Sequence, residues 1–391
     1  MHASNPFDMQ TIDFVKHNEE VRQVWDAYLL GDPIRVPVGN FTIGPRIWIL
    51  DPALNTEGIT WEAFSTDPEL MFQVVLKYKH YLLHNIVHDV EMGIPEQWDT
   101  FVEFCNVTEA GWLGCDIHYP QGQVIATTPR YTGDRKNEIL DRGIPDPFSG
   151  IYATVKEYYE YFLARAIDYE FYDRPVRVQL PWTGLSTDGP LTVAMDVRGE
   201  EILTDMLLDP DYYHQLMTLI VEATITKVKA WRAYLGLEAK PQCGGFADDV
   251  IQLISTDTYR EYVLPYHKRL LDELYGGGPH MMHICGDVQR HFPTLIQELN
   301  INHFDTGFPI NFATLRDEIG ENVHINGGVH IGLLLNGTAE QVREETKRIL
   351  QSGIMRGGKF IMKEANNLPP RVPLENMQAM YEATREFGRY K

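Results

Sequence analysis

The chain has 391 residues, of which 44% are hydrophobic, so a large buried core is expected. The formal net charge of −21 would repel a nucleic acid and leaves a small molecule or another protein as the partner. No apolar run is long enough to span a membrane, no signal peptide is recognisable, and four cysteines are too few for a disulfide framework, which together indicate a reducing cytoplasm.

The pattern along the chain predicts one domain over residues 1–391. Residues 1–30 are expected to form an N-terminal helical extension, and residues 85–150, which are rich in turn signals, to form insertions over one mouth of the fold. A small separate cap is the alternative for 85–150. The second half alternates strands, at 176–180, 281–285, 303–308, 323–325 and 359–362, with helices at 211–235, 259–275 and 339–352.

Strand followed by helix, repeated, is typical of parallel strands covered by helices. The pattern by itself leaves a closed barrel and an open sheet as alternatives. No glycine-rich phosphate motif follows any strand, which argues against a dinucleotide-binding fold. In a barrel the catalytic residues lie at the C-terminal ends of the strands, so candidate residues are expected there.

The sharpest local feature is the pair His283 and Cys285 at the end of the strand expected at 281–285. Side chains two residues apart on a strand point to the same face, so both are expected to face one point in the lumen. Imidazole and thiolate are ligands that suit zinc, and a catalytic zinc site has three protein ligands and one open position. The alternative is that both residues are buried only for packing.

Several aspartates near strand ends are candidate acids or bases. Asp248 and Asp249 follow Gly244 and Gly245, and either can serve as a general acid or base unless it caps the next helix. Asp287 and Asp305 also lie near strand ends. Asp287 is a further candidate acid, and either of the two can orient a ligand histidine or act as a structural cap.

On the basis of these residues and of the segments named below, the chain resembles the uroporphyrinogen decarboxylase superfamily, and within it the corrinoid-dependent methyltransferase branch. The zinc motif of that branch resembles His283-Ile284-Cys285-Gly286. Segments that agree in order and spacing over residues 175–390 are Asp188-Gly189-Pro190, Asp209-Pro210, Asn326-Gly327-Gly328-Val329, Gly337-Thr338 and Pro369-Pro370. The resemblance implies a (β/α)8 TIM-type barrel and a corrinoid protein as partner.

Departures from the family pattern affect the expected metal site. The methyltransferases have a third zinc ligand, a cysteine, just before the Pro-Pro pair, and Asn366 stands at that position here. An amide is a poor zinc ligand, so we expect Glu364 or His330 to complete a set with His283 and Cys285, or no metal to bind. The arginine-rich segment of the decarboxylases is reduced to Arg46.

The expected function is therefore transfer of a methyl group from a small methylated substrate, for example an aryl methyl ether, to the cobalt of a separate corrinoid protein. The resemblance also permits the reverse arrangement, in which zinc activates a thiol that accepts the methyl group. A decarboxylase or lyase acting on a carboxylated ring compound, and a non-catalytic ligand-binding barrel, are the alternatives. The oligomeric state stays open, with a homodimer among the candidates.

Overall fold

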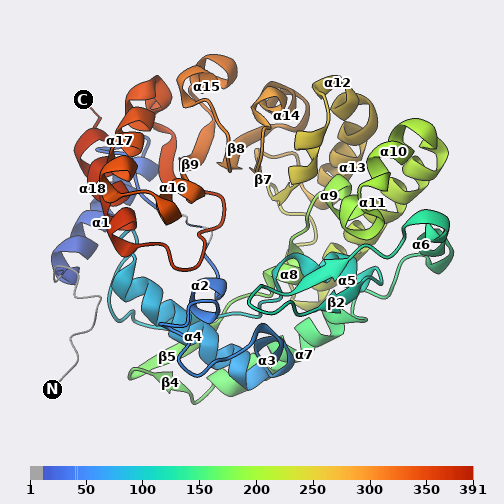
Figure 1. Cartoon of the computed structure of the whole chain (residues 1–391), viewed down its shortest axis with the longest axis horizontal. Coiled ribbons are helices and arrows are strands. Elements are labelled where there is room, and N and C mark those ends of the chain that lie inside the picture. Colours follow the sequence, from blue (N-terminus) through green and yellow to red (C-terminus); the bar gives the residue numbers. More distant parts are fainter. Residues whose placement is uncertain (1–11, 40, 42, 391) are drawn as a thin grey trace.

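The computed structural model describes residues 12–39, 41 and 43–390, and Figure 1 shows its elements. The first half contains α1 (Phe14–Leu29), α2 (Arg46–Ile49), α3 (Trp61–Thr66), α4 (Pro68–Asn85), β1 (Trp98–Thr100), η1 (Cys105–Val107), α5 (Thr108–Trp112), β2 (Asp116–His118), β3 (Ala126–Thr128), η2 (Gly133–Arg135), α6 (Glu138–Arg142), α7 (Ile151–Ala166), β4 (Glu170–Phe171) and β5 (Arg174–Val178).

The second half contains α8 (Trp182–Leu185), α9 (Pro190–Arg198), α10 (Glu201–Leu208), α11 (Pro210–Tyr234), β6 (Gly245–Ala247), η3 (Asp249–Leu253), α12 (Thr256–Thr258), η4 (Tyr259–Val263), α13 (Leu264–Leu274), β7 (His280–Ile284), η5 (Gln289–His291), α14 (Phe292–Leu299), β8 (Ile301–Thr306), α15 (Phe312–Ile319), β9 (His324–His330), α16 (Ile331–Asn336), α17 (Ala339–Ile349), η6 (Leu350–Ile354), η7 (Arg356–Gly358), β10 (Phe360–Ala365) and α18 (Leu374–Phe387). The strands and helices expected from residue 176 onward are all present, with boundaries shifted by a few residues, and the strand expected at 176–180 is β5.

The central feature is a parallel sheet in the order β10-β9-β8-β7-β6. Parallel bridges continue it at both edges, from Met362 on β10 to Val38 and from Ala247 on β6 to Asp188. A second parallel pair, β1 with β5, belongs to a separate three-stranded sheet in the order β1-β5-β4. The predicted α/β class is therefore confirmed. In the described residues the two parallel arrangements are separate sheets, and one isolated bridge extends each edge of the five-stranded sheet.

The strands are buried because helices cover their outer side, as Figure 1 shows for α14 and α15 beside β7 and β8. Every residue of β10 is buried, which is typical of a parallel strand covered on both faces. The long helix α11 carries apolar residues at helical spacing and packs against α13. This arrangement leaves the C-terminal ends of the strands as the edge at which polar side chains can gather.

The N-terminal helix is part of the folded body. Glu20 on α1 accepts hydrogen bonds from Arg385 on α18 at 2.5 and 3.0 Å, and Figure 1 shows α1 beside the C-terminal helices. Residues 1–11 of the expected extension lie outside the described residues. Within 85–150, β1 pairs with β5, so this range supplies a strand of the three-stranded sheet as well as short helices and the hairpin β2–β3. No helix in the described part of the chain is long and apolar enough to cross a bilayer.

Candidate metal and active site

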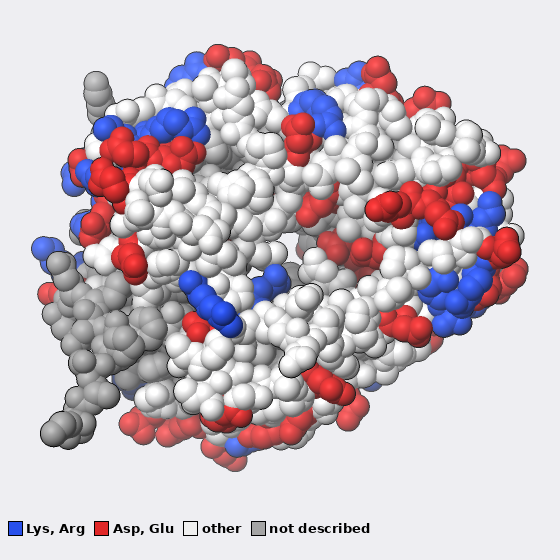
Figure 2. Space-filling model, in the orientation of Figure 1, with Lys and Arg blue, Asp and Glu red and all other residues white. Residues whose placement is uncertain are grey.

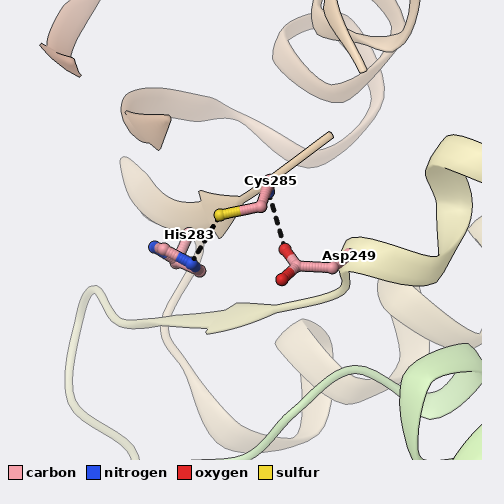
Figure 3. A group of neighbouring side chains, drawn as sticks. All are labelled: Asp249, His283 and Cys285. Carbon is pink, nitrogen blue, oxygen red and sulfur yellow. Dashed lines mark hydrogen bonds between the residues drawn. The ribbon is translucent and has the colours of Figure 1, made fainter. Parts of the chain in front are cut away.

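His283 and Cys285 lie together at the C-terminal end of β7. The ring nitrogen Nε2 of His283 is 3.2 Å from Sγ of Cys285. The backbone N–H of Cys285 donates to Oδ1 of Asp249 at 2.7 Å, and Figure 3 shows the three side chains converging. One ligand atom from each residue lies within 4.8 Å of the other two. The strand alternation in the sequence thus predicted the pair, and Asp249, at the start of η3 just after β6, adds a third donor.

The imidazole of His283 is oriented from behind by Asp305 on β8. Its Nδ1 is 2.7 Å from Oδ2 of Asp305, while Oδ1 of Asp305 accepts from Nζ of Lys363 at 2.6 Å. Burial raises the pKa of Asp305, but the hydrogen bonds and charges of His283 and Lys363 lower it below its usual range. A carboxylate on Nδ1 fixes the ring orientation and directs Nε2 toward Cys285 and Asp249.

The same contacts act on His283. Burial lowers its pKa, and the hydrogen bonds to Asp305 and Cys285 outweigh burial, so that the pKa of His283 is raised to about 10. Burial raises the pKa of Asp249 above its usual range, although the charge of His283 and the hydrogen bond from the N–H of Cys285 lower it. One nitrogen, one sulfur and one carboxylate oxygen make a donor set that fits a catalytic zinc ion, which takes three protein ligands and one further ligand.

A cavity of about 930 Å³ opens beside this group. His283, Ala247, Asp188 and Phe246 line it on the sheet side, and the lining also includes Trp182, whose side chain is largely exposed. This volume is in the range of sites that enclose a small organic molecule. Figure 2 shows a hollow near the middle of this face with acidic side chains along one side of it.

Asp248 lies next to Asp249 in the chain but in a different environment. Its side chain is fully buried. Oδ1 accepts from the backbone and hydroxyl of Thr192 at 3.0 and 2.7 Å, while Oδ2 accepts from Leu191 N at 3.2 Å and lies 2.8 Å from His267 Nε2. These bonds tie the start of α9 to the sheet, and Asp248 is not among the described residues that line the cavity.

Three other candidates lie apart from the group of three. Asp287 has a side chain that is 77% exposed and forms an ion pair with Arg290 at 3.5 Å. His330 caps α16, where its Nδ1 accepts from Gly332 N at 2.8 Å. Glu364 is fully buried on β10 and supplies none of the three clustered ligand atoms.

The position of the family's third ligand is also resolved. Asn366 has a left-handed backbone with φ of 98°, and its side-chain oxygen accepts from the backbone N–H of Asn367 at 2.7 Å. Its amide is therefore engaged with its own turn. In the described structure the third donor near His283 and Cys285 is Asp249, which the sequence singled out as an acid or base but not as a ligand.

Some residues of the site gave no clear sequence signal. Lys363 reaches Asp305 from two strands away, and Glu109 accepts from the hydroxyl of Thr187 at 2.6 Å and from the backbone N–H of Asp188 at 2.8 Å. The ammonium of Lys227 is 3.0 Å from Glu109 and holds it in place. These contacts join segments more than 50 residues apart, so only the strand order could have indicated them.

The family described as Uroporphyrinogen decarboxylase (URO-D) matches residues 51–387, and the chain belongs to it. A Methanosarcina mazei protein named Methylated-thiol--coenzyme M methyltransferase is 33% identical over 203 residues, which are 50% of this chain and 51% of the relative. A Methanosarcina acetivorans protein named Methylcobamide:CoM methyltransferase MtbA is 24% identical over 54% of this chain and 59% of the relative. The matched part thus spans little more than half the length of these curated relatives.

A solved structure titled methyltransferase from Methanosarcina mazei superposes with a TM-score of 0.62 at 20% sequence identity, covering 94% of this chain and 98% of that one. At this identity the likeness shows the fold. The resemblance of the sequence to the superfamily is therefore confirmed.

Proposed function

We propose that this chain transfers a methyl group from a small methylated substrate, with an aryl methyl ether as the favoured donor, to the cobalt of a separate corrinoid protein. The observation that carries the proposal is the group of Asp249, His283 and Cys285 beside a cavity of about 930 Å³. The names of the two relatives, both methyltransferases, support methyl transfer as the reaction class.

In this proposal Asp249, His283 and Cys285 hold a zinc ion, with Asp305 fixing the ring of His283. A zinc ion bound there supplies Lewis acidity to the oxygen that leaves the methyl group. The chain's own part is to bind the ring of the donor in the cavity, to exclude bulk water, and to present the methyl group toward the open mouth. The corrinoid protein docks at that mouth, since its cobalt has to approach the methyl carbon in line with the breaking bond.

The test begins with metal content. We expect about one zinc per chain in the purified protein by mass spectrometry, and loss of most of it in H283A and in C285S. H330A is the matched control, because its histidine lies on the next but one strand and caps a helix. Zinc retained in both H283A and C285S would exclude this group as the metal site.

Activity is measured with cobalamin reduced to cobalt(I), whose visible spectrum changes when the cobalt is methylated. Ring-substituted methoxybenzenes are the probes, with and without the corrinoid protein. We expect methylation with wild type, and a loss of about 100-fold or more in H283A, since Lewis acidity contributes several kcal/mol to such a step. No methylation from any methoxyarene would reject the proposed donor class.

A second direction of transfer follows from the relatives' names, in which methyl passes from a methylated cobamide to a thiol. The same assay detects it as loss of methyl from methylated cobalamin on adding a thiol. The decarboxylase alternative finds less support in the cavity. Among the described lining residues Arg46 and Arg232 are the arginines, and Arg232 donates to the carbonyls of Ala239 and Leu274 at 3.0 and 2.7 Å. A substrate with several carboxylates needs more cations than that.

A further inference from the structure

We infer that Asp188, which lines the same cavity as His283 and lies two segments away from it, is the proton donor to the leaving oxygen. This inference rests on the proposed function and adds a catalytic residue to it. It comes from the strand register, which places an acid, a small residue and a metal ligand side by side in one row.

The row, continued to Asp305, crosses four neighbouring segments. Asp188 forms a parallel bridge with Ala247, Ala247 pairs with His283, and His283 pairs with Asp305. Residues directly paired in parallel strands have side chains on the same face, and neighbouring strands lie about 4.8 Å apart. Asp188 and His283 are therefore separated by about 10 Å at the backbone. Asp188, Ala247 and His283 all line the cavity.

The residue between Asp188 and His283 leaves space for a ligand. Ala247 has only a methyl side chain, so little of the cavity between the two polar side chains is filled. A planar ring bound over Ala247 would place the oxygen of its methoxy group between His283 and the carboxyl group of Asp188. A larger side chain at 247 would fill this space.

The backbone of Asp188 is fixed while its carboxyl group faces the cavity. Its N–H donates to Oε2 of Glu109 at 2.8 Å, and the hydroxyl of Thr187 donates to Oε1 at 2.6 Å. No hydrogen bond to the carboxyl oxygens of Asp188 occurs within residues 12–39, 41 and 43–390. The contrast with Asp248, whose two oxygens accept several hydrogen bonds, shows which of these acids is available to a ligand.

The surroundings favour the neutral form of this group. Burial raises the pKa of Asp188 well above its usual range, and the negative charges of Glu109, Asp196, Asp249 and Asp248 raise it further. The nearby ammonium of Lys227 is engaged with Glu109 and Ser186. A carboxylic acid that keeps its proton at neutral pH can donate it during catalysis.

Cobalt(I) of the corrinoid supplies both electrons of the new carbon–cobalt bond, and the electron pair of the broken carbon–oxygen bond stays on the oxygen. The proton of Asp188 passes to that oxygen, which leaves as a neutral phenol. Asp188 is left as a carboxylate and recovers a proton from water in the open cavity before the next turnover.

The experiment compares D188N with wild type on two methyl donors, anisole and 4-nitroanisole, using cobalamin reduced to cobalt(I). Anisole releases a basic oxygen that needs the proton, whereas nitrophenolate leaves more readily without one. We expect D188N to lose about 100- to 1,000-fold on anisole and much less on 4-nitroanisole. An equal loss on both donors indicates a structural role and overturns the inference. D287N is the matched control, since Asp287 has a side chain that is 77% exposed, pairs with Arg290 and is not among the described lining residues.

A second measurement is independent of the methyl donor. Infrared difference spectra between pH 6 and pH 9 should show a protonated carboxyl band at neutral pH that is missing in D188N. If D188N fails to fold by circular dichroism, Asp188→Ser takes its place. The band without methyl transfer from any ether would reject the proposed donor and keep Asp188 as an acid of the cavity. Absence of the band at pH 7 would overturn the inference itself.

Discussion

The ion pair between Lys227 and Glu109 should be among the largest single contributions to stability around the cavity. Lys227 lies on α11 with a side chain that is 0% exposed, and Glu109 on α5 is 12% exposed. The ammonium bonds to Glu109 at 3.0 Å, to the hydroxyl of Tyr152 at 3.1 Å and to the carbonyl of Ser186 at 2.8 Å. In K227M a carboxylate stays buried without its cation, next to the acid Asp188.

The magnitude follows from the geometry. Two unit charges 3.0 Å apart attract by about 5.5 kcal/mol at an effective dielectric constant of about 20. Loss of one partner of a buried pair typically costs about 3–5 kcal/mol, because the other charge stays desolvated. We therefore expect K227M to lower the free energy of unfolding by about 3–5 kcal/mol at pH 7.5. The double variant K227M/E109Q should recover part of that loss, since it removes the uncompensated charge.

The assay is urea denaturation followed by circular dichroism, with the cavity tryptophan fluorescence as a second probe. K229M is the control, because Lys229 lies on the same helix and pairs with Glu273 at 2.7 Å, with side chains 46% and 51% exposed. An exposed pair of this kind contributes about 1 kcal/mol or less. The reasoning is refuted if K227M and K229M lose the same small amount, or if the double variant is less stable than K227M.

Three further predictions concern single residues. Burial, with Glu109 and Asp248, raises the pKa of Asp196 to about 7. The folded state then holds a proton that the unfolded state releases above about pH 4, so stability falls as pH rises toward 7. D196N should reduce the fall between pH 5 and pH 8 by about 2–3 kcal/mol in urea titrations, and an unchanged pH profile contradicts this. H330A should cost about 1 kcal/mol through the lost cap on α16 while leaving zinc content unchanged. In G189A the new Cβ would lie 2.4 Å from Cβ of Asp248, so we expect a loss of about 3 kcal/mol in thermal or urea unfolding.

The sequence by itself determined the α/β class, the position of the strands in the second half and the pairing of His283 with Cys285. These features depend on local periodicity, because the alternation of a strand and the 3.6-residue repeat of a helix can be recognised from consecutive residues alone. Asp305, near the end of the next strand, lies against His283 with its Oδ2 at 2.7 Å from Nδ1, and its role in orienting a ligand histidine stays a prediction.

Only the tertiary structure decided which acids join that pair. Asp248 and Asp249 are neighbours in the chain, yet Asp248 ties α9 to the sheet while Asp249 reaches the N–H of Cys285. Consecutive residues at the end of a strand point in different directions, but the local sequence does not determine which of these two aspartates faces the lumen. The sequence offered Glu364 as a possible third ligand and gave no signal for Lys363, yet Lys363 is the residue of β10 that reaches Asp305.

Asp188 could be placed beside the cavity only through its bridge to Ala247, 59 positions further along the chain. Such pairings depend on how the strands are ordered and shifted against one another, and that order is set by the packing of the whole sheet against its helices. A strand's own residues fix which of them share a face, whereas the partners on that face come from distant segments that the local pattern does not contain.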